Sequence, residues 1–203
     1  MNIEIREIEK KDYKKAIQFA AIGMNFNIYM DSKILLKLYG LYFWYSELNE
    51  ATHVFAAYEG NQLMGVLLAN VYGEKKKYRS FAKTAFVAML ELFQKLLYGG
   101  GVGVYGKANQ EMYDAYTKNN SPDGQIVFLA ADPEAKGKGI GSLLLDELEK
   151  REKGKELYLY TDDACTYQFY EHRGFIRSGE KDIVMELREK VVPLKCMLYS
   201  KKF

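Results

Sequence analysis

The sequence predicts an α/β (α+β) protein in which about seven strands form a sheet flanked by helices. Short apolar runs typical of strands alternate along the chain with segments whose apolar residues recur at helical spacing. The Gly60-Asn61 pair joins two of the apolar runs in a turn that is typical of a β-hairpin. No internal repeat or long linker divides the chain, so we expect residues 1–203 to form a single domain.

The predicted strands are runs rich in β-branched, aromatic and other apolar residues. Pro193, inside the last run, favours an edge or the start of a strand because it donates no backbone hydrogen bond. The seven runs are residues 2–8, 52–58, 62–72, 125–131, 156–161, 181–187 and 191–200.

The predicted helices are recognised by their caps and by apolar residues at helical spacing. Asp12 and Ser32 stand where N-caps would open helices over residues 13–24 and 33–45. Further helices are expected at residues 78–98, at 139–153, where Gly154 would close the helix, and at 165–173. A polar helix or loop carries the chain from the glycine run after residue 98 to residue 124.

Composition narrows the functional classes. The formal net charge of +2 gives no electrostatic reason to expect nucleic acid or an anionic membrane as partner. Two cysteines and two dispersed histidines make neither a disulfide framework nor the usual zinc spacing, so we expect no metal. The most apolar stretch, residues 34–45, is too short to span a bilayer and contains Lys37. We expect a cytoplasmic protein.

Two glycine clusters match phosphate-binding patterns. The first, GGGVGVYGK at residues 99–107, follows a predicted helix, although phosphate-binding loops follow a strand. Its next residue, Ala108, also lacks the hydroxyl that would hold magnesium. We therefore interpret this cluster as a loop; a P-loop NTPase that uses it is a third functional hypothesis.

The second cluster, KGKGIG at residues 136–141, stands between a predicted strand and a predicted helix. Gly139 and Gly141 allow a diphosphate to approach the backbone, whose N–H groups point to it at the helix start. Lys136 and Lys138 add positive charge beside the turn.

Two motifs in this region resemble the signatures of the GNAT superfamily of N-acyltransferases. The stretch LAADPEAKGKGIGSLLLDELE resembles the acyl-CoA-binding motif [Q/R]-x-x-G-x-[G/A], with Lys136 in the place of Gln or Arg. The stretch DDACTYQFYEHRGF is similar to N-x-x-A-x-x-F-Y-E-x-x-G-F, with Asp163 in the place of Asn and Thr166 in that of Ala. Together the motifs cover roughly residues 125–176.

The resemblance implies a GNAT fold with a central, mostly antiparallel sheet, and makes residues 78–124 an insertion between the third and fourth strands. It implies acetyl-CoA as cosubstrate, with the pantetheine arm in a V-shaped slot beside the fourth strand. The cofactor-binding residues carried over are Leu129, Ala130, Ala131, Lys136, Gly137, Lys138, Gly139, Ile140, Gly141, Ser142, Asp163 and Tyr170.

The implied reaction is direct attack of an amine on the acyl thioester. Tyr170 matches the family tyrosine near the thioester sulfur and is the candidate general acid. Asp163 either contacts pantetheine or caps the following helix, a role for which Asp162 competes. A route through Cys165 is disfavoured, because a helix would place His172 about 10 Å away.

The general base and the acceptor stay open. Glu47, Glu50 and Glu91 are candidate bases, although a solvated surface position is the alternative for each. The aromatic group Tyr39, Tyr42, Phe43, Trp44 and Tyr45 either packs in the core or walls an acceptor site.

The leading hypothesis is an N-acetyltransferase acting on the primary amine of a small molecule or peptide. The alternative is a GNAT-like domain that senses acyl-CoA without turnover. The sequence leaves a homodimer open.

Overall fold

The computed structural model describes residues 2–24, 32–98, 103–187 and 190–203. Its strands are β1 (Ile3–Arg6), β2 (His53–Glu59), β3 (Gln62–Val71), β4 (Gly124–Ala131), β5 (Glu156–Asp162), β6 (Ile176–Leu187) and β7 (Lys190–Lys202). Its helices are α1 (Tyr13–Gly23), α3 (Lys33–Glu50), α4 (Phe81–Tyr98), α5 (Val104–Tyr116), α6 (Ile140–Arg151) and α7 (Gln168–His172). The predicted mixed α/β class and the number of strands are therefore confirmed.

The strands form one sheet in the order β1-β2-β3-β4-β5-β7-β6, in which only the β4–β5 pair is parallel. The hairpin predicted at Gly60-Asn61 joins β2 to β3, and Gly60 adopts a left-handed φ of 59° there. Pro193 lies in register with Val184 of β6, beyond the last β5–β7 pair at Asp162 and Cys196. At Pro193, the edge of β7 that faces β5 is therefore not paired with β5. This explains why an inner strand can contain a proline, which has no backbone N–H to donate.

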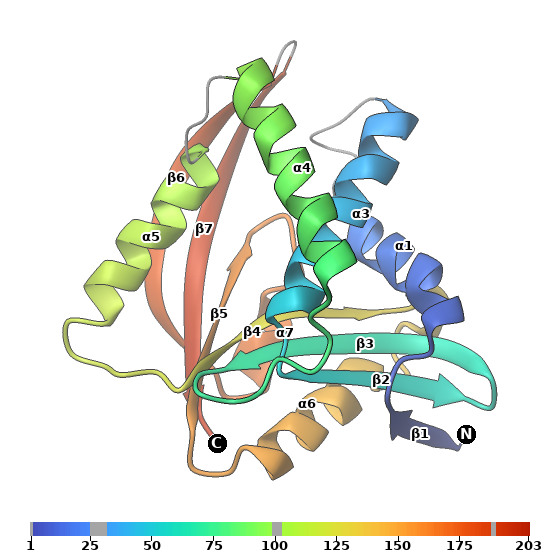
Figure 1. Ribbon diagram of the computed structural model, residues 1–203. Helices are drawn as coiled ribbons and strands as arrows, with labels where there is room; N and C mark the ends of the chain where they lie inside the picture. Colours follow the sequence, from blue (N-terminus) through green and yellow to red (C-terminus); the bar gives the residue numbers. More distant parts are fainter. Residues whose placement is uncertain (1, 25–31, 99–102, 188–189) are drawn as a thin grey trace.

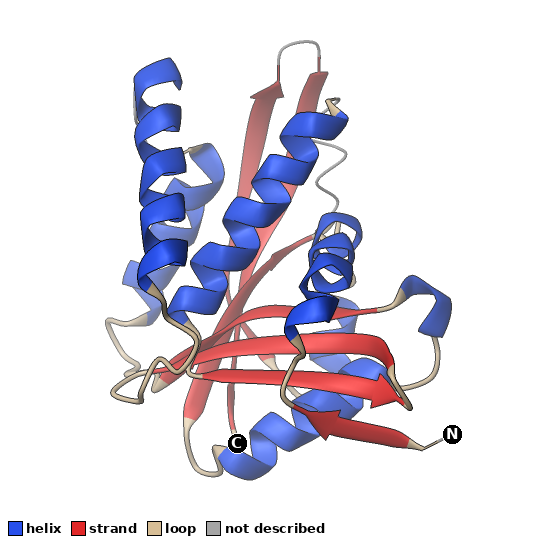
Figure 2. Ribbon diagram, turned by 45° about the vertical axis from the view of Figure 1, so that its right-hand side comes forward, coloured by secondary structure: helices blue, strands red, loops and turns tan. Residues whose placement is uncertain are grey.

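Helices cover both faces of the twisted sheet (Figures 1 and 2). On one face α6 packs on β1 to β4, and the apolar Leu144, Leu145 and Leu148 enter the core there. On the opposite face α1 and α3 cover β3 and β4, while α5 covers β6 and β7. Alternation along β5 serves both faces, because Leu157 and Leu159 join the α6 side while Tyr158 and Tyr160 face α5.

Several predicted helix ends need correction. Asp12 precedes α1 but does not cap it, because its carboxylate accepts a hydrogen bond of 2.8 Å from the Tyr58 hydroxyl. Helix α6 ends at Arg151, before Gly154. The segment 165–167 is not part of α7, which begins at Gln168. Ser32 does cap α3, since its hydroxyl accepts from the N–H of Leu35 at 3.5 Å.

The segment between β3 and β4 contains two helices, α4 and α5, where we had predicted one helix and then a polar helix or loop. Helix α4 packs on α3, and α5 packs on β6 and β7. No helix in the described part of the chain is long and apolar enough to cross a membrane.

Gly65 fixes the position of α6 on the sheet. A Cβ atom at Gly65 of β3 would lie 2.6 Å from Cγ2 of Ile140, the first residue of α6, and 3.0 Å from the carbonyl oxygen of Ala130. Only glycine therefore lets the start of α6 lie directly on the strand.

Gly65→Ala is expected to destabilise the protein by roughly 1–3 kcal/mol, because the added methyl group overpacks the α6–β3 contact. Urea denaturation measures this cost. Gly23→Ala is the matched control: its Cβ would meet Ala130 Cβ at an ordinary 3.6 Å, so no loss of stability is expected. Equal stability of the Gly65 variant and the wild type would contradict the role of this contact.

Candidate functional site

Strands β4 and β5 diverge soon after they meet. They pair only at Gly124 with Leu157 and at Gln125 with Tyr158, although β4 continues to Ala131 and β5 to Asp162. Beyond this point β4 keeps its pairing with β3, while β5 keeps its pairing with β7. A wedge of unpaired backbone therefore opens between the two strands toward their carboxyl ends, as the resemblance implied.

The backbone of β4 has a definite orientation in the wedge. The N–H of Asp132 donates to the carbonyl oxygen of Met64 in the strand preceding it, so Asp132 points toward β3. Because backbone groups alternate along a strand, Ala130 also points toward β3, whereas Leu129 and Ala131 point into the wedge. Of the three β4 residues predicted to bind cofactor, Leu129 and Ala131 thus turn their backbone groups into the wedge, where no strand of the described chain pairs with them, and Ala130 does not.

The chain leaves β4 through a short 3₁₀ turn and enters the glycine turn at residues 136–139. Gly137 and Gly139 adopt left-handed φ angles of 83° and 72°, which glycine reaches without strain. A Cβ atom at either position would meet no protein atom within 4 Å. The outer side of the turn is therefore open to a ligand.

Most of the backbone N–H groups of the turn are available. The N–H groups of Lys136 and Lys138 bond to the carbonyls of Pro133 and Ala135. Within the described chain, no acceptor is found for the N–H groups of Gly137, Gly139, Ile140, Gly141 and Ser142. The last three belong to the first turn of α6, whose N–H groups carry a partial positive charge. The turn thus resembles an anion-binding site, with five available N–H donors of the seven predicted.

The side chains of the turn divide between solvent and core. Lys136 and Lys138 are exposed, and Lys138 Nζ lies 4.0 Å from the Glu59 carboxylate. Ile140, the first residue of α6, is buried between this helix and β3. A Cβ atom at Gly141 would lie 3.3 Å from the ring of Phe169, so this glycine lets α7 pack against the start of α6.

Asp132 and Lys15 hold the turn in place, and the sequence analysis did not identify them. Asp132 accepts from the N–H of Glu134 at 3.1 Å, and its other oxygen lies 2.8 Å from Lys15 Nζ. Lys15 also donates to the carbonyl of Leu63 at 2.8 Å. Burial of Asp132 opposes ionisation, but the hydrogen bonds from Lys15 and Glu134 outweigh it and lower the pKa of Asp132. No motif marks this pair, because it joins α1 to the end of β4.

Tyr170 lies on α7 among three aromatic rings. Its ring centroid is 5.3 Å from that of Phe169, 5.7 Å from Phe175 and 6.4 Å from Tyr199. Burial, and next the nearby Cys165 thiol, raises the pKa of Tyr170. Its hydroxyl has no hydrogen-bond partner among the described residues. The phenol is therefore protonated at neutral pH and free to donate.

Neither aspartate at the end of β5 caps α7. Asp163 pairs with β7, since its N–H donates to the carbonyl of Lys195 and its carboxylate accepts from the Lys195 N–H at 3.0 Å. Asp162 accepts from the Ala164 N–H at 3.0 Å and from the Tyr105 hydroxyl at 3.0 Å. The capping alternative is therefore wrong, and pantetheine contact by Asp163 stays a prediction.

Cys165 is a poor nucleophile. Burial, followed by the charge of Asp162, raises the pKa of the Cys165 thiol to about 12, and its sulfur lies 3.6 Å from the carbonyl oxygen of Gly23. The helical distance used for Cys165 and His172 does not apply, because α7 begins after Cys165. The protonated thiol nevertheless disfavours a route through this residue.

The three candidate bases differ in their surroundings. Glu91 accepts a hydrogen bond of 3.3 Å from the Tyr42 hydroxyl, and Glu50 forms an ion pair with Lys76. Glu47 has no hydrogen-bond or ion-pair partner for its carboxylate in the described chain. Burial, and then the charge of Glu50, raises the pKa of Glu47 to about 7. Glu47 is thus the candidate whose pKa suits a base at neutral pH.

The aromatic group of α3 is mainly core. Trp44 is fully buried between Tyr13 and Phe128, and Phe43 also packs edge-on against Phe128. Tyr45 packs against Phe86 of α4. The core interpretation is confirmed for Trp44, while the partly exposed Tyr42 faces α4 through Glu91.

The first glycine cluster lies partly outside the described residues, since residues 99–102 are not described. Gly103 is the N-cap of α5, and residues 104–107 form its first turn. The element before the cluster is α4, as expected for a connection between helices.

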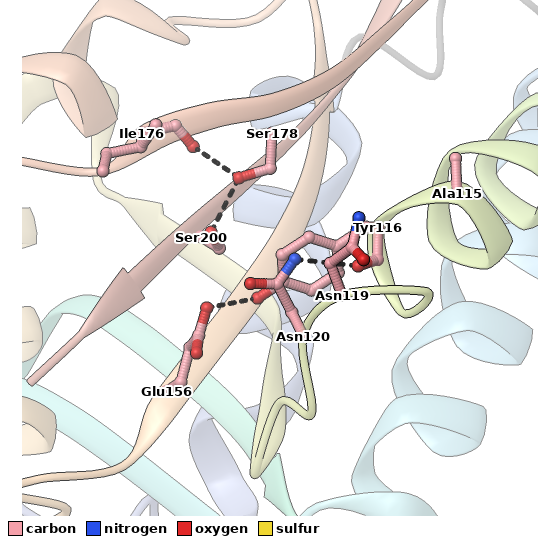
Figure 3. Close-up of a pocket in the computed structure, with 8 residues that line it drawn as sticks. All are labelled: Ala115, Tyr116, Asn119, Asn120, Glu156, Ile176, Ser178 and Ser200. Carbon is pink, nitrogen blue, oxygen red and sulfur yellow. Dashed lines mark hydrogen bonds between the residues drawn. The ribbon is translucent and has the colours of Figure 1, made fainter.

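A pocket and a cluster of potential metal ligands lie elsewhere in the protein, and their polar side chains bond to other side chains of the protein. A pocket of about 450 Å³ lies at the β6 side of the sheet, where Ser178 bonds to Ser200 and Tyr116 bonds to Glu156 (Figure 3). It includes no residue of the glycine turn or α7. His53, Glu74 and Glu152 also cluster, but Lys155 Nζ lies 2.6 Å from both carboxylates and occupies the position that a cation would take.

Comparison with known proteins agrees with this geometry. Residues 82–177 match the family model of the GNAT acetyltransferase domain. No curated protein sequence matches the chain. The chain has the GNAT fold, and residues 82–177 are similar to the GNAT acetyltransferase domain.

Solved structures with the same fold share little sequence identity with the chain. A histone acetyltransferase HPA2 and related acetyltransferase from Corynebacterium glutamicum matches with a TM-score of 0.58 at 14% identity, covering 98% of this chain and 96% of its own. The PaiA N-acetyltransferase from Thermoplasma acidophilum, solved in complex with coenzyme A, gives 0.51 at 17% identity, covering 100% of both chains. An N-acetyltransferase from Staphylococcus aureus gives 0.52 at 18% identity, covering 100% and 99%.

Glu47→Gln is expected to stabilise the protein more at pH 8 than at pH 5, by about 1–2 kcal/mol in urea denaturation. With the pKa of Glu47 raised to about 7, the unfolded chain ionises first as the pH rises above 4.5, and folded stability falls up to pH 7. Glu91→Gln, on the neighbouring helix, is the control. An equal effect of Glu47→Gln at both pH values would argue against a raised pKa of the Glu47 carboxyl group.

Proposed function

We propose that this protein is an N-acetyltransferase that transfers the acetyl group of acetyl-CoA directly to the primary amine of a small molecule or peptide. The observation that carries the proposal is the wedge between β4 and β5, which opens beside a turn with five available N–H groups. Coenzyme A has a diphosphate at one end of a long amide-containing arm, and this arrangement offers a site for each part.

The diphosphate is assigned to the turn from Lys136 to Ser142. The available N–H groups of Gly137, Gly139 and the first turn of α6 donate to its oxygens, and Lys136 adds a long-range positive charge. The absence of side chains at Gly137 and Gly139 lets the ligand approach this backbone. The pantetheine arm then lies in the wedge, where its amides bond to Leu129 and Ala131 as an added strand would.

Tyr170 is assigned as the general acid. The amine nitrogen attacks the thioester carbonyl, the C–N bond forms and the C–S bond breaks. The departing thiolate takes the phenolic proton, while a base accepts the proton lost by the amine. A tyrosine whose raised pKa keeps it protonated suits this donor role.

Glu47 is assigned as the base or as the start of a water chain to it, on its pKa of about 7. We also assign residues 1–203 to one domain with residues 78–124 as its insertion, since a single sheet uses strands from both ends of the chain. A reducing cytoplasm suits two free cysteines.

The alternative is a domain that binds acyl-CoA without turnover. It is favoured by the bonding of Asp163 to β7, which engages the residue in the place of the family asparagine. Turnover of acetyl-CoA against a panel of amines separates the two functions, because a sensor binds the thioester but releases no free thiol.

Gly139→Ala is expected to weaken coenzyme A binding by roughly 10–100-fold in calorimetry, because a methyl group would occupy the space where the diphosphate meets the backbone. Gly154→Ala is the matched control. Gly154 also has a left-handed φ, of 87°, and open space around it, so it incurs the same backbone strain far from the turn. If both variants bind coenzyme A like the wild type, the turn is not the diphosphate site.

Tyr170→Phe is expected to lower kcat by about 10²–10⁴ with little change in coenzyme A affinity, because only proton donation is lost. Tyr167→Phe removes a hydroxyl from the residue just before α7 and serves as control. A kcat for Tyr170→Phe that equals the wild-type value across the pH range would remove this residue from the mechanism.

A further inference from the structure

The outer face of α4 is apolar, although it is exposed. Phe81, Met89 and Leu92 are 90%, 57% and 59% exposed, and three alanines lie between them on the same face. The inner face is apolar too, since Val87 and Leu90 are buried. Helix α4 lies beside α3 at the upper end of the molecule (Figure 1). A helix on the surface normally has a polar outer face, so this one requires a partner.

The spacing of the exposed residues indicates that the partner is a helix. Phe81, Ala85, Ala88 and Leu92 follow one another at intervals of four, three and four, which is the spacing of the contact line in a pair of packed helices. Two alanines at the centre of this line allow the two helix axes to approach closely.

We propose that this face of α4 binds the same face of α4 in a second copy of the chain, antiparallel about a two-fold axis. A two-fold axis between positions 85 and 88 places Ala85 against Ala88 of the second copy, and Phe81 against Leu92. Small residues then meet at the centre and large residues meet at both ends, so the face is complementary to itself.

The charges of the helix agree with this arrangement. Glu91 is the only charged side chain among the exposed residues of α4 between positions 81 and 92, and it lies well away from the two-fold axis between positions 85 and 88, so it does not meet Glu91 of the second copy. Arg79, exposed just before α4, comes to the end of the helix that carries Glu91 of the second copy. The basic start of each helix thus lies beside the negative end of the other helix dipole.

The same features disfavour a membrane as the partner. An interfacial helix has a broad apolar face and a basic polar face on its other side. Here the other side of α4 packs on α3, where Phe86 contacts Tyr45, and Lys83 turns inward to the carbonyl of Tyr78 at 2.7 Å. The exposed line between Phe81 and Met89 consists of alanines, which insert little apolar volume into lipid.

Sedimentation velocity of the full chain over a range of concentrations tests the proposal. A contact one helix wide buries less than the roughly 800 Å² per partner of a strong complex, so we expect a dimer in the micromolar range. Ala85→Glu is expected to weaken the dimer at least about 100-fold without changing the circular dichroism melt, because the site is exposed. Val191→Glu, at an exposed site on β7, is the control and should leave the dimer intact.

The double variant Ala85→Glu/Ala88→Lys tests the register. In the antiparallel pair each new carboxylate faces a new ammonium group, so the dimer should return; in a parallel pair like charges would meet and it would not. A wild-type monomer at the highest concentrations, or an Ala85→Glu variant that dimerises normally, would overturn the proposal. So would a monomer that sediments with phosphatidylserine vesicles and loses this binding on Phe81→Ser.

Discussion

The divergence of β4 from β5 is the constraint on which the site depends. Each strand pairs on its outer side, β4 with β3 and β5 with β7. Between them, β4 and β5 share only two residue pairs. Beyond these pairs the inner edges have N–H and C=O groups that no strand among the described residues pairs with, although a closed sheet would use them. The free energy of pairing on the outer sides maintains an opening that the two strands would otherwise close by pairing with each other.

Internal contacts hold the glycine turn in place. Gly65 leaves room for Ile140 to pack on the sheet, and Gly141 leaves room for Phe169 to pack on α6. Asp132, at the end of β4, forms an ion pair with Lys15 of α1. These contacts are internal and leave the outer side of Gly137 and Gly139 uncovered. A supported inner side with an open outer side fits the proposed role of the turn, in which its N–H groups donate to an anion.

Helices α4 and α5 form hydrogen bonds with neighbouring elements of the fold. Tyr105 of α5 bonds to Asp162 at the end of β5, and Tyr42 of α3 bonds to Glu91 of α4. Helix α5 is therefore linked to the end of β5, and helix α4 to α3.

The amino-acid sequence by itself determined the strands, most helices and the position of the glycine turn, because these depend on local periodicity and on residues such as Gly139 that a tight turn requires. It also selected between the two glycine clusters, since the neighbouring element is a local feature. Only the tertiary structure decided that Ala130 faces β3, that Asp163 bonds to β7, and that Lys15 supports the turn. These facts depend on strand register and on contacts between residues far apart in the chain, which leave no periodic signal in the sequence.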